Sequence, residues 1–335
     1  ALAYACIGVA CAGLLYLGLT AICKAWGSAN VMKYFPPVVT GPIIIAIGLN
    51  LAPSAINNCS ANWWIALVAI VVVIICNIWG KGMVKIIPIL LGVIASYAVA
   101  AVSNNVDFTL VKEADWFGLP IIWQNTGLSV FTNGDTDWGM VLTSVITIVP
   151  IAFATMMEHV GDISAIGGTV GKNFIKDPGL HRSLFADGLS NVLSGLVGST
   201  PNTTYGENMG VMAITGVYST WVIGGAAVFA IVFSFIGKVA ALIHGIPTPV
   251  MGGVCILLFG FIAASGIRML VEKKVAYTRS KNLILTAVTM ITGLSGATVV
   301  LGPVQLKGMG LATVVAMVLS LAFIFFEKNG LENRN

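Results

Sequence analysis

The sequence predicts an all-α protein that crosses a membrane many times, and three observations predict this class. Hydrophobic residues make up 57% of the 335 positions, and the mean hydropathy is +0.95. Only 9% of the residues are charged, against about 25% in soluble domains. Apolar runs that approach the roughly 20 residues of a spanning helix recur along the chain. A soluble globule of this composition would lack the polar side chains that cover a surface.

The apolar runs predict about eleven spans, taken in order along the chain. They cover residues 2–23, 36–53, 63–79, 84–102, 139–157, 183–198, 207–217, 219–243, 247–267, 282–300 and 308–326. Two of them are defective. The run 183–198 is short, and 207–217 is a half-length helix that follows a polar break.

Lysine and arginine in the connections predict the orientation, because cytoplasmic loops of membrane proteins carry an excess of both. If Lys24 and Lys33 lie on the cytoplasmic side, alternation of the spans places 14 of the 17 basic residues there. The three exceptions are Lys112, Lys238 and Lys307, and Lys238 either snorkels or pairs with a carboxylate. The C-terminus is then cytoplasmic. The first residue falls on the outer face and is not methionine, so we expect an N-terminally truncated chain.

An internal repeat is indicated by two similar segments. Pro37–Gly41 resembles Pro249–Gly253 at an offset of 212 residues, and a further glycine follows each at the same spacing. Transporters are often built from two inverted repeats, although chance similarity between two helix starts is the alternative. The same offset would place the counterpart of Glu207 before Ala1.

Several classes of site and partner are not expected. The basic residues are scattered without interleaved aromatic residues, which argues against nucleic acid. The chain has no motif of a metalloprotease, a serine hydrolase or a nucleotide-binding loop, so a membrane enzyme is disfavoured. We expect no cofactor and no metal. The cysteines are expected to be buried apolar side chains and not disulfides; they are Cys6, Cys11, Cys23, Cys59, Cys76 and Cys255.

Ionisable residues at membrane depth are functional candidates, because they are costly to place there. Glu158 and Asp162 are four residues apart, so both lie on one helical face. Two neighbouring carboxylates in such a setting can share a proton. His159 points about 100° away and is expected to be structural or interfacial. For Asp187 we expect a local salt bridge near Arg182 or a role at a helix end.

The polar break interrupts the apolar pattern after residue 198. Pro201 ends the preceding helix, and Thr203–Tyr205 favour a strand. Gly206 leaves the backbone accessible, and Glu207 and Asn208 then open a half-helix. Its free N–H groups beside a carboxylate would suit a small planar heterocycle with adjacent N–H and C=O groups. The simpler alternative is a kink with a capping glutamate.

Two motifs resemble the nucleobase–ascorbate transporter family. Glu207–Gly216, "ENMGVMAITG", resembles the motif of this family, and Glu158–Asp162, "EHVGD", resembles its second element. "DPGLHRS" and "GSTPNTTYGENMGVMAIT" are similar to the uracil permease branch. The resemblance implies 14 spans in two inverted seven-span repeats, with a core and a gate domain. The chain would hold spans 4–14, with 139–166 and 201–217 as broken spans and a short strand before the second half-helix.

The resemblance also implies a domain division. Its parts are 1–27 as a core-domain remnant (span 4), 28–105 as gate-domain spans 5–7, 106–137 as an outer loop, 138–243 as core-domain spans 8–11 with the substrate site, and 244–335 as gate-domain spans 12–14 with the cytoplasmic tail.

The substrate residues follow from the family motifs. Glu158 and Glu207 are expected to hydrogen-bond the pyrimidine ring, assisted by the Gly206 amide, with Tyr205 and Asn208 beside them.

Proton coupling is expected from Asp162 and Glu158. Asp162 stands where the best-known uracil carriers of the family have histidine, whereas many purine carriers have aspartate. The expected function is secondary active transport of uracil across the cell inner or plasma membrane by proton symport and alternating access. A xanthine or urate permease is the alternative, and a non-transporting sensor or structural protein is a further one. An acidic site argues against an anion carrier. The expected partners are a nucleobase, protons and the bilayer, with a homodimer left open.

Overall fold

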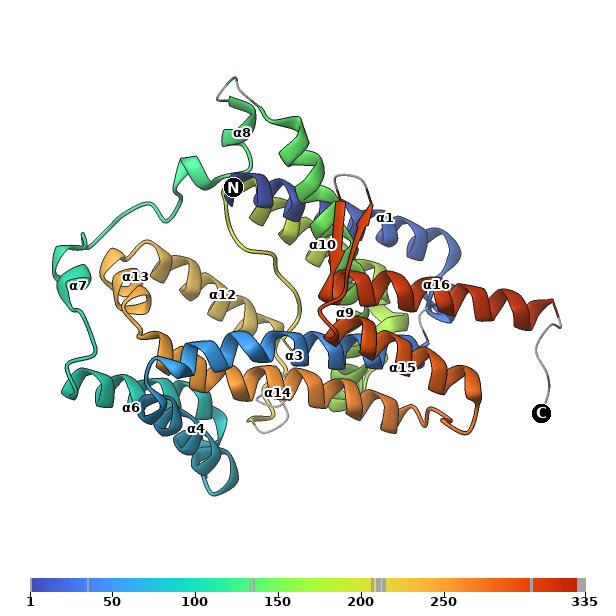
Figure 1. Ribbon diagram of the computed structural model, residues 1–335. Coiled ribbons are helices and arrows are strands. Elements are labelled where there is room, and N and C mark those ends of the chain that lie inside the picture. Colours follow the sequence, from blue (N-terminus) through green and yellow to red (C-terminus); the bar gives the residue numbers. More distant parts are fainter. Residues whose placement is uncertain are drawn as a thin grey trace. The chain divides into compact units, whose positions relative to one another are not determined.

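Helices dominate the computed structural model, which describes residues 2–34, 36–132, 134, 136–205, 208, 212, 215–301 and 304–329 (Figure 1). Within these residues, five helices are long and apolar enough to cross a membrane: α1 (Leu2–Trp26), α3 (Pro37–Ser60), α9 (Trp138–Val170), α14 (Thr248–Glu272) and α16 (Gly308–Lys328). The other helices of eight residues or more are α4 (Trp63–Ile78), α6 (Pro88–Val102), α10 (Leu180–Val197), α12 (Thr220–Ser234), α13 (Gly237–His244) and α15 (Ser280–Leu294). The predicted all-α class is therefore confirmed in its coarse form.

Short elements connect these helices. They are α2 (Ser28–Val31), α5 (Met83–Ile86), α7 (Thr109–Glu113), α8 (Ser129–Thr132), η1 (Met32–Tyr34), η2 (Trp123–Asn125) and η3 (Ile175–Gly179). Two strands, β1 (Thr298–Leu301) and β2 (Val304–Lys307), pair antiparallel with Thr298 opposite Lys307.

Most helices begin where the apolar runs predict them, and local residues explain the starts. The side chain of Asn62 caps α4 by accepting hydrogen bonds from the amides of Trp64 and Ile65, which satisfies two of the free donors at a helix start. Asp137 caps α9 in the same way. Pro88 opens α6, where its missing N–H does no harm.

Four expectations about the spans are wrong. The run 84–102 is not one helix, because the chain leaves the helix at Ile87, between α5 and α6. The run 219–243 is not one helix but two, because the chain leaves the helix at Ile236 to pair with Phe117. The run 282–300 ends as a helix at Leu294 and continues into β1. The span expected to be broken within 139–166 is continuous, since α9 runs through Pro150. A proline removes one hydrogen bond of a helix, which neighbouring structure can compensate.

The described chain divides into two compact units. The first contains Ala1–Asn50, Ile121–Gly206 and Ile262–Asn335, and the second contains Leu51–Pro120 and Glu207–Phe261. The core of the first unit lies between α1, α9 and α10 and is built from buried apolar residues. These are Ala12, Tyr16, Cys23, Val31, Ala152, Met156, Val160, Leu180 and Leu184.

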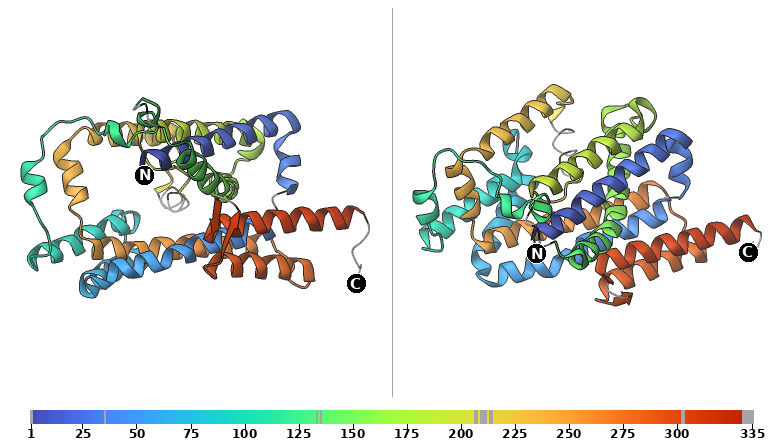
Figure 2. Two further views of the ribbon diagram at one scale, coloured as in Figure 1. Left: turned by 45° about the horizontal axis from the view of Figure 1, so that its top comes forward. Right: turned by 90° about the horizontal axis from the view of Figure 1, so that it is seen from above.

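Glycines allow α1 and α10 to approach closely, and the two helices lie side by side in both views of Figure 2. A Cβ atom on Gly13 would lie 2.6 Å from the amide nitrogen of Val192, and one on Gly188 would lie 2.7 Å from Cβ of Tyr16. One on Gly195 would collide with the carbonyl oxygen of Cys6. Small residues at helix contacts are typical of membrane proteins, where close backbone packing replaces the hydrophobic effect.

In the second unit, α4 packs against α6 and α13 packs against α7. Lys238, at the start of α13, donates hydrogen bonds of 2.7 and 2.8 Å to the carbonyl oxygens of Val111 and Lys112. Among the described residues, Lys238 forms no salt bridge with a carboxylate, because its ammonium group binds backbone carbonyls at the end of α7.

The two repeat segments begin matching helices. A shift of 212 residues places α3 on residues 249–272, and α14 is Thr248–Glu272. Each segment uses glycine for close packing. In the first unit, a Cβ atom on Gly41 would lie 2.6 Å from side-chain atoms of Leu270, and in the second unit one on Gly252 would lie 2.6 Å from the amide nitrogen of Cys59.

Candidate functional site

The two carboxylates predicted to act together lie on one helix, as expected. Glu158 and Asp162 are both in α9, one turn apart, and both are half-buried. The hydroxyl of Thr204 donates a hydrogen bond of 2.7 Å to Oδ2 of Asp162. Thr204 belongs to the polar segment, which we define as residues 199–205, between α10 and residue 206. The fold thus brings the polar segment onto the carboxylate-bearing face of α9.

The polar segment is not a strand. Residues 201–205 have no regular secondary structure, so the expected short strand is wrong. The described backbone offers no neighbouring strand to this segment. Instead, the side chain of Asn191 on α10 accepts from the amide of Asn202 at 2.7 Å and donates to its carbonyl oxygen at 2.8 Å. Strand propensity did not predict this conformation, because the side chain of Asn191, and not a neighbouring strand, bonds the backbone N–H and C=O groups of Asn202.

A buried pair joins α9 to α10 beside this segment. Nδ1 of His159 lies 3.3 Å from Oδ2 of Asp187, and the two side chains are 3% and 8% exposed. The structural alternative for His159 is confirmed, because its side chain is buried and not interfacial. The expectation for Asp187 is wrong, because Asp187 lies in the middle of α10 and contacts His159, and the structure, which describes both Asp187 and Arg182, shows no salt bridge between them. A buried polar group that loses its neighbouring polar group is costly, so this contact favours the packing of α9 on α10.

Tyr16 is a polar residue of this region that sequence reasoning missed. It lies on α1 with 1% of its surface exposed, and its hydroxyl donates a hydrogen bond of 2.7 Å to Oγ1 of Thr155, one turn before His159 on α9. One sequence feature could have indicated this residue: Tyr16 and Thr20, both with hydroxyl groups, lie four positions apart in an apolar run. A buried tyrosine usually has a partner for its hydroxyl, and here the partner is 139 residues away.

The remaining predicted residues can be placed only in part. Tyr205 is described and 57% exposed, and Asn208 is described and exposed. Gly206 and Glu207 lie outside the described residues. Among the described residues, no three His, Cys, Asp or Glu side chains form a group that could hold a metal ion. All six cysteines have free thiols and are buried or half-buried.

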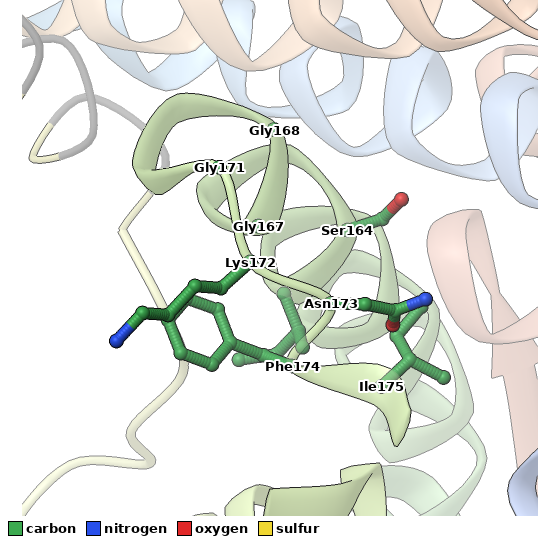
Figure 3. Close-up of a pocket in the computed structure, with 9 residues that line it drawn as sticks. Ser164, Gly167, Gly168, Gly171, Lys172, Asn173, Phe174 and Ile175 are labelled. Atoms are coloured by element: carbon green, nitrogen blue, oxygen red, sulfur yellow. The ribbon is translucent and has the colours of Figure 1, made fainter. Parts of the chain in front are cut away.

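A separate cavity of about 310 Å³ lies at the C-terminal end of α9 (Figure 3). Three glycines, Gly167, Gly168 and Gly171, leave the space open, and Ser164, Lys172 and Asn173 supply its polar groups. In Figure 3 the side chains of Lys172 and Asn173 leave the loop in opposite directions. Of the predicted site residues that the structure describes, Glu158, Asp162, Tyr205 and Asn208, none lines this cavity.

Comparison with known proteins identifies the family. The family model described as the permease family matches residues 2–302. A uracil permease of Paenibacillus larvae subsp. larvae is 48% identical over 330 residues, which cover 94% of this chain and 75% of that protein. The uracil permease of Escherichia coli strain K12 is 46% identical over 322 residues, which cover 93% and 72%.

The same result comes from a third relative, the uracil permease of Bacillus subtilis strain 168. It is 42% identical over 332 residues, which cover 95% of this chain and 75% of the relative. Together with the long apolar helices, these matches make the chain a multi-pass membrane protein and a permease rather than an enzyme. The chain belongs to the permease family, in the branch whose members are named uracil permease.

Proposed function

We propose that the chain carries uracil across the cell membrane together with a proton. The observation that carries the proposal is the hydrogen bond between Thr204 and Asp162, because it places the polar segment against the carboxylates of α9 within a unit of apolar helices. Polar backbone at membrane depth must be buried in protein or line a cavity. The relatives named uracil permease support uracil as the substrate.

Uracil presents ring N–H donors next to carbonyl acceptors, so its site needs acceptors and donors side by side. In our proposal, the carboxylates of Glu158 and Glu207 accept hydrogen bonds from the ring N–H groups. The amide of Gly206 donates to a ring carbonyl, and Tyr205 and Asn208 complete the site. A carboxylate that accepts from N–H forms a charge-assisted hydrogen bond, which favours a pyrimidine with free N–H groups.

Asp162 and Glu158 carry the coupled proton in this proposal. The Thr204 hydroxyl can hold Asp162 in either state, since it donates to an ionised carboxylate and accepts from a protonated one. Loading the site with uracil and a proton then permits the core domain, 1–27 and 138–243, to move against the gate domain, 28–105 and 244–335. This motion is the alternating access of inverted-repeat carriers. The proposal also includes the 14-span topology of two inverted repeats and a cytoplasmic C-terminus.

Uptake of labelled uracil tests the transport step directly. Cells or proteoliposomes that contain the chain should accumulate uracil above the empty-vector level, and a protonophore should abolish accumulation. Uptake that is insensitive to the protonophore would remove proton symport from the proposal. An excess of unlabelled xanthine or urate should leave uracil uptake unchanged. Because Asp162 stands where many purine carriers have aspartate, strong competition by either purine would favour the purine alternative.

Two substitutions test the binding roles. Glu158→Gln and Glu207→Gln should each raise the KM for uracil several-fold, because the amide oxygen of glutamine still accepts a hydrogen bond but loses the charge assistance, a difference of about 1 kcal/mol. The matched control is Glu272→Gln, which removes an exposed carboxylate that pairs with Arg268 on α14. An unchanged KM in either test variant would remove that glutamate from the site.

A further inference from the structure

Asn191 is a buried residue of α10 whose side chain bonds the polar segment. It is 3% exposed. Its amide nitrogen donates to the carbonyl oxygen of Asn202 at 2.8 Å and to that of Asp187 at 3.0 Å, and its carbonyl oxygen accepts from the amide of Asn202 at 2.7 Å. Both N–H groups of the carboxamide are therefore used, as expected for a buried amide.

The contact with Asn202 has the pattern of a strand pair. A neighbouring strand would bond both the N–H and the C=O group of one residue, and here one side chain bonds both. The chain reaches this position because α10 ends at Gly198 with φ of 85°, after which Ser199 still donates to the carbonyl of Ser194 at 2.8 Å. The polar segment then returns along α10 over the 11 residues that separate Asn191 from Asn202.

The same contact determines where the site residues lie. Thr204, which bonds Asp162, follows Asn202 by two residues, and two residues of extended chain span only about 7 Å. Asn191 also donates to the carbonyl of Asp187, whose side chain contacts His159 on α9. The carboxamide of Asn191 thus connects α10 to the polar segment, one helical turn from the residue that contacts α9.

We propose that Asn191 is a positioning residue of the substrate site. It fixes the polar segment at Asn202, and through it the Thr204 hydroxyl and the residues that follow, in the conformation that binds substrate. Asn191 acts through the segment and does not touch the substrate. Its link to uracil rests on the proposed function, whereas its hold on the segment rests on the two hydrogen bonds between its side chain and the backbone of Asn202.

The substitution Asn191→Thr keeps the hydrogen bond to Asp187 and removes the two hydrogen bonds to Asn202. A threonine hydroxyl in a helix can bond the carbonyl four residues earlier, as Thr289 bonds Leu285 in this protein, so the contact with Asp187 is kept. The hydroxyl is too short to reach Asn202, and both bonds to the segment are lost. The matched control is Asn202→Ala, which keeps both backbone bonds to Asn191 and removes only the exposed bond from the Asn202 side chain to Ser190.

Amide exchange tests the hold on the segment without any substrate. Hydrogen–deuterium exchange at residue 202 should become at least tenfold faster in Asn191→Thr and stay within about twofold of the unchanged chain in Asn202→Ala, since the loss of two hydrogen bonds exceeds 1.4 kcal/mol. Equal protection in Asn191→Thr and the unchanged chain would overturn the proposal.

Uracil uptake tests the positioning role. If only about a tenth of the Asn191→Thr molecules hold the segment in the binding conformation, the KM rises about tenfold while Vmax per inserted molecule stays within about twofold. A merely structural residue would lower the amount of inserted carrier and leave the KM unchanged, and that result would overturn the positioning role. Absence of uracil uptake by the unchanged chain would overturn the proposed function instead. Amide exchange would still show whether Asn191 holds the polar segment in place.

Discussion

Oδ2 of Asp162 accepts a hydrogen bond of 2.7 Å from Thr204, and this bond joins two parts of the chain that are 42 residues apart. Asp162 comes from the C-terminal third of α9, and Thr204 comes from the polar segment after α10. A carboxylate within a membrane-spanning helix is costly without a partner. The hydroxyl supplies one, and it brings two motifs of the sequence together in the first unit.

Replacing Thr204 tests this bond. Thr204→Val keeps the shape of the side chain but removes the hydroxyl, so uracil uptake at low concentration should fall about tenfold, which corresponds to 1.4 kcal/mol for a hydrogen bond to a carboxylate. Thr204→Ser keeps the hydroxyl and should retain uptake within about twofold. The measurement is the initial rate of labelled-uracil uptake per inserted molecule. A valine variant as active as the serine variant would contradict the assigned role.

Close packing of α1 on α10 predicts opposite effects for two glycines of one helix. Gly13→Ala places a Cβ atom 2.6 Å from the amide nitrogen of Val192 and should lower stability by ~1–3 kcal/mol. Gly18→Ala meets no atom within 4 Å and should be neutral or stabilising, since alanine favours helix more than glycine does. Thermal unfolding of the purified protein in detergent measures both. Equal melting temperatures for the two variants would refute the packing argument.

The buried pair of His159 and Asp187 should matter far more than the exposed pair of Arg268 and Glu272. Asp187→Ala leaves the buried imidazole of His159 without its polar neighbour and should lower stability by ~1–3 kcal/mol. Glu272→Ala removes an ion pair on side chains that are 76% and 52% exposed and should change stability by less than ~1 kcal/mol.

Replacing both buried partners by leucine should recover part of the loss, because no polar group then remains unpaired. Thermal unfolding of the purified variants in detergent measures this recovery of stability as well. An Asp187→Ala variant as stable as Glu272→Ala would show that the pair contributes little.

Lys238 should hold the end of α7. Its ammonium group binds two carbonyl oxygens of that short helix, which have no partner within the helix. Lys238→Met should therefore raise amide exchange over residues 109–118 several-fold. Lys112→Met, which removes an exposed lysine from α7 itself, is the control and should leave exchange unchanged. Equal exchange in both variants would mean that water satisfies these carbonyls equally well.

Much of the helix plan could be predicted from local sequence, and the exceptions have identifiable causes. Apolar runs located the starts of α1, α3, α4, α14 and α16 to within one residue, whereas α3 and α14 continue seven and five residues beyond the predicted ends. The break between α12 and α13 could not be predicted, because it depends on the pairing of Ile236 with Phe117, which lies 119 positions earlier in the chain. The β1–β2 hairpin was missed for a related reason, since an apolar run such as Thr298–Leu301 suits a helix or a strand equally well.

The sequence by itself determined the class of protein, the order of its helices and the pairing of Glu158 with Asp162 on one helical face. These depend on hydrophobicity and on helical spacing, which neighbouring residues set. Only the tertiary structure decided which residues meet. It paired Tyr16 with Thr155, His159 with Asp187 and Asn191 with Asn202. Each of these contacts joins different elements, and each forms because a buried polar group requires a partner that only packing can bring within reach.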